Sequence, residues 1–217
     1  MSAPAILRHG AVDLALHPLK QGPGRPLLLL HGLGEASPTT LPARYASWPG
    51  PVHGLDFTGH GSSTVPAGGG YSAETLMGDA DAAIAHLGEV TIVGRGLGAY
   101  IGLLVAGARP EQVRGAVLAD GPGMAGGGST PASPALHWVD PDAPAPPDPW
   151  ALVELTCDPR PPDYAATFLR QAVMFSGLDE PVLVSAAGRP PWVEAVLAEP
   201  GVRAVPLAEA LSLLASV

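Results

Sequence analysis

Continuous apolar runs alternate with segments of helical spacing along most of the chain. One run, PLLLLH at residues 26–31, ends at Gly32, and similar runs follow at residues 52–55, 90–93, 115–119, 181–185 and 202–205. A run that is apolar throughout is typical of a strand buried on both faces of a parallel sheet. Other segments repeat apolar residues at helical spacing, which predicts helices at residues 72–87, 97–108, 164–175, 192–197 and 207–215.

Strands that alternate with helices predict right-handed βαβ units, and therefore an α/β fold with a mostly parallel sheet flanked by helices on both faces. Two shorter runs, at residues 5–8 and 12–17, are separated by His9-Gly10 and predict a hairpin at one edge of the sheet. Ser72 is the predicted N-cap of the first helix. The length of 217 residues favours a single domain over residues 1–217.

Residues 121–162 interrupt this alternation. They contain eleven prolines and the run Gly126-Gly127-Gly128, with little periodicity. Proline and glycine at this density predict a loop-rich segment. We expect it to form a Pro/Gly-rich cap or lid insertion within the domain.

The composition supports a folded core and excludes several classes of partner. Hydrophobic residues make up 47% and charged residues 14% of the chain, and the net charge is −9. An acidic chain without a Lys/Arg cluster is not expected to bind nucleic acid or an anionic membrane surface. No metal-ligand spacing, phosphate-binding loop or dinucleotide fingerprint is present, so we expect no metal and no cofactor.

Cysteine usage and the N-terminal pattern predict a soluble, cytoplasmic protein. Cys157 is the single cysteine, which rules out an intramolecular disulfide and fits a reducing compartment. The first residues, MSAPAILRHGAVDLAL, lack the basic and apolar regions of a signal peptide. No apolar stretch reaches the length of about 18 residues expected for a membrane span.

Four motifs, in this chain order, resemble those of the α/β-hydrolase superfamily: LLLLHGLGE (27–35), LDFTGHGSS (55–63), VTIVGRGLGAYIGLLVAGARPEQVRGAVLADG (90–121) and EPVLVSAAG (180–188). The resemblance covers nearly the whole chain. It implies an oxyanion loop after His31-Gly32 and a structural turn after Asp56. It also implies a nucleophile elbow at residues 94–98 and, after 181–185, the place from which the family presents its catalytic acid.

The residues of a Ser/acid/His triad are missing from the positions that the resemblance assigns to them. The elbow GRGLG carries Gly96 where the serine nucleophile belongs. The acid position is followed by Ala187-Gly188-Arg189, and no Asp or Glu occurs before Glu194. All seven histidines precede residue 138, so none follows the last strand. Without an imidazole no hydroxyl is activated, and we expect no catalytic residue, only a vestigial nucleophile position at Gly96.

A binding pocket is still expected around the elbow. The backbone N–H groups of Leu33 and Leu97 are where the family builds its oxyanion hole, and they suit a carboxylate, a carbonyl or a water. The predicted pocket comprises His31, Leu33, Arg95, Gly96, Leu97, Asp120 and His137.

Several of these residues also have purely structural interpretations. The His31 ring can hold the loop by bonding backbone, and Asp120 can serve as a turn or cap residue. Arg95 can be exposed or cap the helix, and His137 can be a plain loop residue.

Two functions remain open at this stage. The first is a pseudoenzyme that binds a small molecule or a protein partner, including a second copy of itself in a homo-oligomer, through the vestigial pocket. The alternative is a hydrolase or lyase that acts on a small ester, amide or carbonyl substrate with other residues, such as His31, Asp120 or a bound water.

Overall fold

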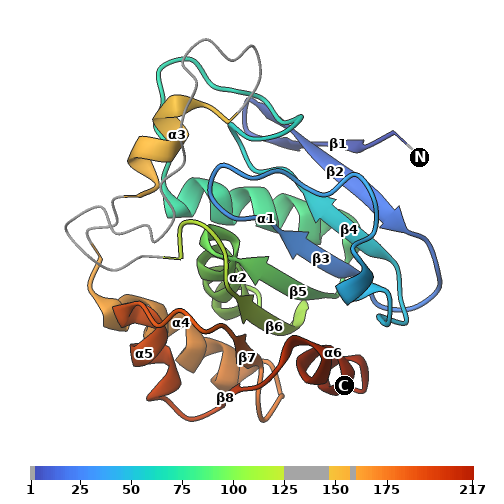
Figure 1. The fold of residues 1–217 in the computed structure, drawn as a ribbon, viewed down its shortest axis with the longest axis vertical. Helices are drawn as coiled ribbons and strands as arrows, with labels where there is room; N and C mark the ends of the chain where they lie inside the picture. Colours follow the sequence, from blue (N-terminus) through green and yellow to red (C-terminus); the bar gives the residue numbers. More distant parts are fainter. Residues whose placement is uncertain (1–2, 125–146, 157–159) are drawn as a thin grey trace.

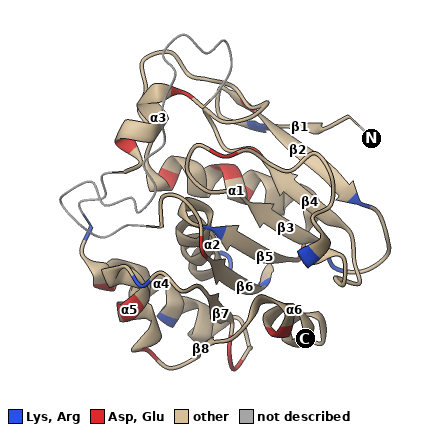
Figure 2. Cartoon of the chain, in the orientation of Figure 1, with Lys and Arg blue, Asp and Glu red and all other residues tan. Residues whose placement is uncertain are grey.

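The computed structural model describes residues 3–124, 147–156 and 160–217. His137, Cys157 and most of the predicted cap insertion lie outside these ranges. Among the described residues, no helix combines the length and the apolar composition that crossing a membrane requires. Figure 2 shows Lys and Arg spread over separate elements of the described chain.

An eight-stranded sheet forms the centre of the molecule (Figure 1). Its spatial order is β1 (Ala5–His9), β2 (Val12–Lys20), β4 (Val52–Leu55), β3 (Leu27–Leu30), β5 (Val90–Arg95), β6 (Val113–Ala119), β7 (Val182–Ser185) and β8 (Val202–Ala204). The pairs β1–β2 and β2–β4 are antiparallel, and every other neighbouring pair is parallel. The predicted edge hairpin and the mostly parallel sheet are therefore confirmed.

Helices cover both faces of the sheet, as predicted. One face packs against α1 (Ala73–Leu87), α2 (Leu97–Ala108), α4 (Pro162–Phe175) and α5 (Pro191–Leu197). The other face carries α6 (Leu207–Ala215) and the short 3-10 helix η1 (Ala43–Tyr45). Ser72 caps α1 by accepting a hydrogen bond from the Thr75 N–H at 3.2 Å, which confirms the predicted N-cap.

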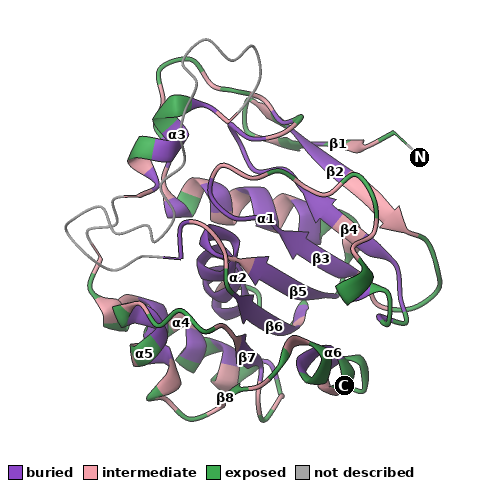
Figure 3. Ribbon diagram, viewed as in Figure 1, coloured by how far each residue is buried: buried purple, intermediate pink, exposed green. Residues whose placement is uncertain are grey.

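Strand β3 shows why an uninterrupted apolar run suits the centre of this sheet. Leu28 and Leu30 face α1 and α2, whereas Leu27 and Leu29 face the side of α6, and all four are buried (Figure 3). Each fully buried leucine contributes about 1.5–3 kcal/mol relative to an exposed one. Through these four side chains, β3 packs against the helical layers on both faces of the sheet.

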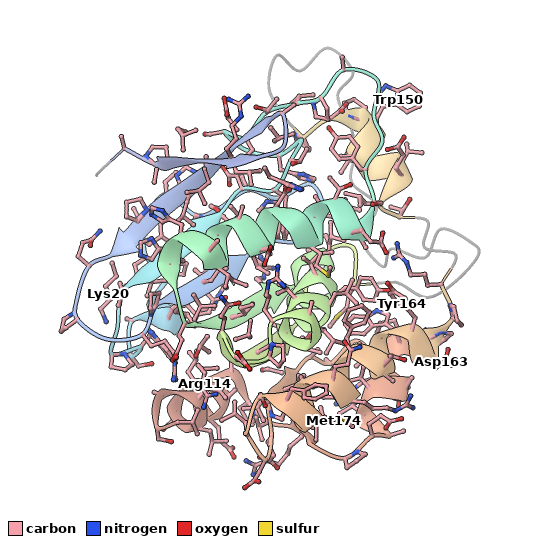
Figure 4. All side chains as sticks on the ribbon, turned by 180° about the vertical axis from the view of Figure 1, so that it is seen from behind. Lys20, Arg114, Trp150, Asp163, Tyr164 and Met174 are labelled. Carbon is pink, nitrogen blue, oxygen red and sulfur yellow. The ribbon has the colours of Figure 1, made fainter. Side chains whose placement is uncertain are left out.

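A six-residue helix, α3 (Pro149–Glu154), lies within the segment predicted as loop. It is too short to show periodicity in the sequence, but Asp148 caps it and Pro149 occupies the first helical position. Trp150 on α3 is 59% exposed and points away from the rest of the chain in Figure 4. The predicted loop-rich insertion thus contains one short helix among its described residues.

The crossover from β3 to β4 lacks the helix that usually joins parallel strands. β3 and β4 pair in parallel, yet residues 31–51 between them form no regular element except the three-residue η1. A three-residue turn covers less of the sheet than a full helix does. This leaves room for a pocket beside the carboxyl ends of β3 and β5.

Candidate functional site

Gly96 forms the sharp turn between β5 and α2. Its backbone has φ +53° and ψ −115°, a region that residues with a Cβ rarely adopt, and its N–H donates to the Ala119 carbonyl at 3.0 Å. A Cβ added at Gly96 would overlap the carbonyl oxygen of Pro122 and the carbonyl group of Gly121. The space that a serine side chain needs is therefore filled by backbone.

The Pro122 carbonyl oxygen accepts two hydrogen bonds at the elbow. The Leu33 N–H and the Leu97 N–H both donate to it, each at 3.0 Å. Two backbone donors that converge on one oxygen have the geometry of an oxyanion hole. In this structure the chain's own Pro122 carbonyl accepts from both donors.

Contacts on both sides hold the Pro122 segment over the elbow. Asp120, which follows β6, accepts hydrogen bonds from the N–H groups of Ala187 at 2.7 Å and Gly188 at 2.9 Å. Two residues after Pro122, the Met124 carbonyl accepts one from the Trp192 indole at 2.6 Å. Asp120 thus ties the end of β6 to the loop after β7, the loop from which the resemblance expects a catalytic acid.

The His31 ring lies buried under the oxyanion loop. Its Nδ1–H donates to the Gly32 carbonyl at 2.8 Å, and its Nε2 accepts from the Phe57 N–H at 3.1 Å. Burial lowers the pKa of His31 below its usual value, so the ring is neutral at pH 7. Both nitrogens are engaged by backbone, which leaves neither available as a general base in this conformation.

His60 also forms a hydrogen bond with the backbone of the oxyanion loop. Its Nδ1–H donates to the Thr58 carbonyl at 3.0 Å, and its Nε2 accepts from the Gly34 N–H at 3.2 Å. Burial, together with the neighbouring His31 ring 5.0 Å away, lowers the pKa of His60 to about 4. The two neutral imidazoles hold the backbone on which the Leu33 donor depends.

Asp56 organises the turn after β4 that the resemblance treats as structural. Its carboxylate accepts from the Ser37 N–H at 2.7 Å, the Ser62 N–H at 2.8 Å and the His17 Nε2 at 2.8 Å. Burial alone would raise the pKa of Asp56, but these hydrogen bonds outweigh it and the pKa lies below the usual value. Asp56 therefore stays ionised and links three separate segments.

Arg95 points toward the oxyanion loop and pairs with Glu35. The Arg95 Nη1 donates to both carboxylate oxygens of Glu35, at 2.8 and 2.7 Å, and Glu35 also accepts from the Gly32 N–H at 2.9 Å. Both side chains are about a third exposed, so the pair adds little stability by itself. Its effect is to fix the Gly32 turn beside the elbow.

A pocket of about 250 Å³ lies on the side of the sheet that carries α6 and η1. We call it the crossover pocket, and its lining includes Leu29, Val93, residues 35–38, Arg44 and Tyr45. His31 and Arg95 also line it, whereas Leu33, Gly96, Leu97 and Asp120 do not. The residues predicted as one pocket are thus divided between this cavity and the filled elbow.

The groups that define the crossover pocket and the filled elbow were not predicted from the sequence. Pro122 acts through a backbone carbonyl, which carries no residue-type signal. The one signal in the sequence was Glu35, which closely follows the His-Gly turn. A charged residue at that place needs a partner of opposite charge. Within the described ranges, no group of three or more His, Cys, Asp or Glu side chains could hold a metal ion.

A mostly parallel sheet with a strand–turn–helix elbow under two convergent backbone donors defines a protein of the α/β-hydrolase type. The model of the alpha/beta hydrolase family matches residues 27–216, and the chain therefore belongs to this family.

Two curated relatives match part of the chain. The (E)-2-((N-methylformamido)methylene)succinate hydrolase of Acinetobacter baylyi is 34% identical over 48% of this chain and 41% of its own length. The 2-hydroxymuconate semialdehyde hydrolase of Pseudomonas putida is 39% identical over 45% of this chain and 37% of its own length. The matches thus span about two fifths of the relatives' length, and both relatives are named hydrolases.

A solved structure supports the fold over the full length. The thioesterase domain from the curacin biosynthetic pathway superposes with a TM-score of 0.60 at 16% identity, covering 98% of this chain and 97% of that one. At this identity the likeness concerns the fold alone.

Proposed function

We propose that this chain is an α/β hydrolase family member that does not hydrolyse esters through its elbow and acts by binding a small molecule or a protein partner. The observation that carries the proposal is the Pro122 carbonyl oxygen, 3.0 Å from both the Leu33 and the Leu97 nitrogen atoms. A substrate carbonyl cannot reach these donors while Pro122 holds them.

Displacing Pro122 would not by itself create a working site. Each hydrogen bond to its carbonyl contributes about 0.5–1.5 kcal/mol net, so a ligand could displace the segment at modest cost. The emptied site would still have Gly96 at the nucleophile position. The buried imidazoles of His31 and His60 would still be neutral and bonded to backbone.

A second candidate is a hydrolase or lyase that acts on a small ester, amide or carbonyl compound with residues other than a Ser/acid/His triad. The names of the two curated relatives favour this candidate over the pseudoenzyme. It requires the Pro122 segment to move and a water to be activated by another group. Asp120 is the exposed carboxylate nearest in the chain to this segment.

The test compares turnover of short p-nitrophenyl esters by the wild-type chain and the Asp120→Asn variant, together with labelling by a fluorophosphonate probe. We expect no covalent labelling and equal, weak rates for both proteins. A rate enhancement above about 10⁴ over water would overturn the proposal, because an oxyanion hole and binding alone give about 10³–10⁴. A high rate that Asp120→Asn abolishes would establish the second candidate.

Three further statements remain predictions from the sequence: the single domain over residues 1–217 with its cap at 121–162, the cytoplasmic location, and the formation of a homo-oligomer. Sedimentation at several concentrations tests the last of these, since a stable dimer keeps its mass on dilution.

A further inference from the structure

The crossover pocket combines an apolar lining with polar groups whose hydrogen-bonding capacity is not used. Leu29 and Val93, near the carboxyl ends of β3 and β5, are 6% and 1% exposed and give the pocket an apolar part of its lining. The Oγ atom of Ser37 is buried and has no hydrogen-bond partner. This oxygen lies against Gly54 on β4 and is not accessible from the cavity, so the polar groups available to a ligand are those of the arginines.

Two guanidinium groups reach the same cavity. Arg95 uses only Nη1 on Glu35, so within the described residues its Nε and Nη2 donors make no hydrogen bond. Arg44 stacks over the Tyr45 ring, with its Cζ 5.0 Å from the ring centre, and has no carboxylate partner among the described residues. Among the described residues that line the pocket, Glu35 is the one carboxylate, and together these residues carry a formal charge of +1.

We propose that the crossover pocket binds small monocarboxylates with a compact apolar body. The carboxylate lies between Arg44 and the unused donors of Arg95, because guanidinium groups bind carboxylates in a planar, two-pronged geometry. The apolar body rests on Leu29 and Val93. A volume of about 250 Å³ equals the share of about eight water molecules in the liquid, which suits a ligand the size of benzoate.

The crossover pocket is positively charged, whereas the chain as a whole is negatively charged. The chain as a whole carries −9, so an anion approaches most of the surface unfavourably. A local charge of +1 offsets one negative charge, and a dicarboxylate would bring its second charge close to Glu35. Monocarboxylates are therefore favoured over both neutral analogues and dicarboxylates.

This inference gives the small-molecule binding proposed above a site and a ligand class, and in that respect it rests on the proposed function. It does not depend on the absence of hydrolysis. None of Gly96, Leu97 and Pro122 lines the crossover pocket, so ester turnover at the elbow and carboxylate binding in the pocket can fail independently.

The test is a titration of the isotope-labelled full chain with benzoate, followed by amide chemical shifts. For a nine-atom ligand we expect saturation with a Kd of about 1 mM and shift changes centred on residues 29–38, 44–45 and 93–95. Benzamide, which has the same shape without the charge, is expected to bind at least about tenfold more weakly. Absence of saturation, or shift changes centred on Leu97 and Pro122, would overturn the proposal.

Three variants distinguish binding of benzoate in the crossover pocket from attraction of benzoate by the net charge of the protein. Arg44→Gln is expected to weaken benzoate binding about tenfold, because it removes the unpaired cation. Arg8→Gln, which removes an exposed cation on β1 far along the sheet from β3 and β5, is expected to change it less than about twofold. Ala36→Trp places a large ring at the exposed rim and is expected to block binding while the melting temperature stays unchanged.

Each outcome with these variants decides the question. Equal weakening by Arg44→Gln and Arg8→Gln would mean that benzoate senses only net charge, and the proposal would be wrong. Full binding to a folded Ala36→Trp variant would place the ligand elsewhere and also overturn it.

Discussion

The backbone N–H of Leu97, the first residue of α2, donates to the carbonyl oxygen of Pro122 at 3.0 Å. This bond joins the helix that follows the elbow to the segment that leaves β6. Because the Leu33 N–H donates to the same oxygen, one carbonyl satisfies two donors that would otherwise lie unpaired at a helix start and a loop. At the elbow, this carbonyl therefore holds three chain segments together.

Substitution of Gly96 is expected to be strongly destabilising. Gly96→Ala and Gly96→Ser should each lower the free energy of unfolding by about 3–5 kcal/mol, since φ +53° strains any residue with a Cβ and that Cβ overlaps the Pro122 carbonyl. Gly96→Ser should also gain no ester hydrolysis. Urea denaturation followed by circular dichroism measures the first effect, and p-nitrophenyl acetate turnover the second.

Gly10→Ala is the matched control for this change. Gly10 also has a positive φ, +60°, but nothing lies within 4 Å of the Cβ that the substitution adds. It should therefore cost only the backbone strain, about 1 kcal/mol. Equal losses at Gly10 and Gly96 would mean that Pro122 does not fill the elbow.

The free energy of unfolding should decrease as the pH is lowered, because of the proton equilibrium of His60. The folded-state pKa of about 4 lies below the unfolded value of about 6.5, so the unfolded state binds the proton first as the pH falls through this window. The contribution is fully present above pH 6.5, and about 3 kcal/mol of it is lost by pH 4. Urea midpoints measured between these pH values test the slope.

His60→Gln provides the comparison for the pH slope. Its amide can still accept from the Gly34 N–H but takes up no proton, so the slope between pH 6.5 and 4 should become shallower. If His60→Gln kept the wild-type slope, the assignment of the pH dependence to this ring would be refuted.

The Tyr71 hydroxyl donates to Asp148 at 2.6 Å in a buried contact that ties α3 to the segment before α1. Burial and the Asp148 carboxylate raise the pKa of Tyr71, so the hydroxyl remains a donor at any ordinary pH. Tyr71→Phe should cost about 1–3 kcal/mol of unfolding free energy. Asp148→Ala should cost about 1 kcal/mol more, since Asp148 also caps α3 through the Trp150 N–H.

A double-mutant cycle of these two substitutions should give a coupling of about 1–2 kcal/mol by urea denaturation. Thr167→Val serves as the control, because the exposed Thr167 hydroxyl donates only to the Asp163 carbonyl at 3.2 Å, and the loss should stay below about 0.5 kcal/mol. A coupling near zero between Tyr71 and Asp148 would contradict the contact.

Removal of the Asp120 carboxylate should loosen the segment over the elbow. Asp120→Ala deletes the acceptor for the Ala187 and Gly188 N–H groups and should raise amide hydrogen exchange at Leu33 and Leu97 by about fivefold to tenfold. Asp120→Asn keeps one acceptor oxygen and should show a smaller rise. Unchanged exchange in Asp120→Ala would show that Pro122 is held without this contact.

Sequence patterns predicted the order of elements well because each pattern reflects local burial. The LLLL run gave β3 correctly, since a strand buried on both faces must be apolar at every position. The ranges of β4, α2 and α6 agree with those predicted. Helix α3 was missed because six residues carry too little periodicity, and its capping aspartate sits in a proline-rich stretch.

The candidate site was predicted less completely, for a physical reason. His31, Arg95 and Leu97 belong to recognisable motifs, so their place near the elbow could be expected. Their partners could not, because Glu35 lies sixty residues from Arg95 in sequence and Pro122 takes part only through its backbone. His137 lies outside the described residues, and its place in a pocket stays a prediction.

By itself, the sequence determined the class of fold and the residue types at the elbow. Apolar periodicity encodes which faces are buried, and the sequence places a glycine at position 96 whatever the packing. Only the tertiary structure decided that the Pro122 carbonyl fills the elbow and that a cavity opens at the β3–β4 crossover. Both depend on how segments distant in sequence approach one another, and a backbone oxygen or an empty volume leaves no trace in the order of side chains.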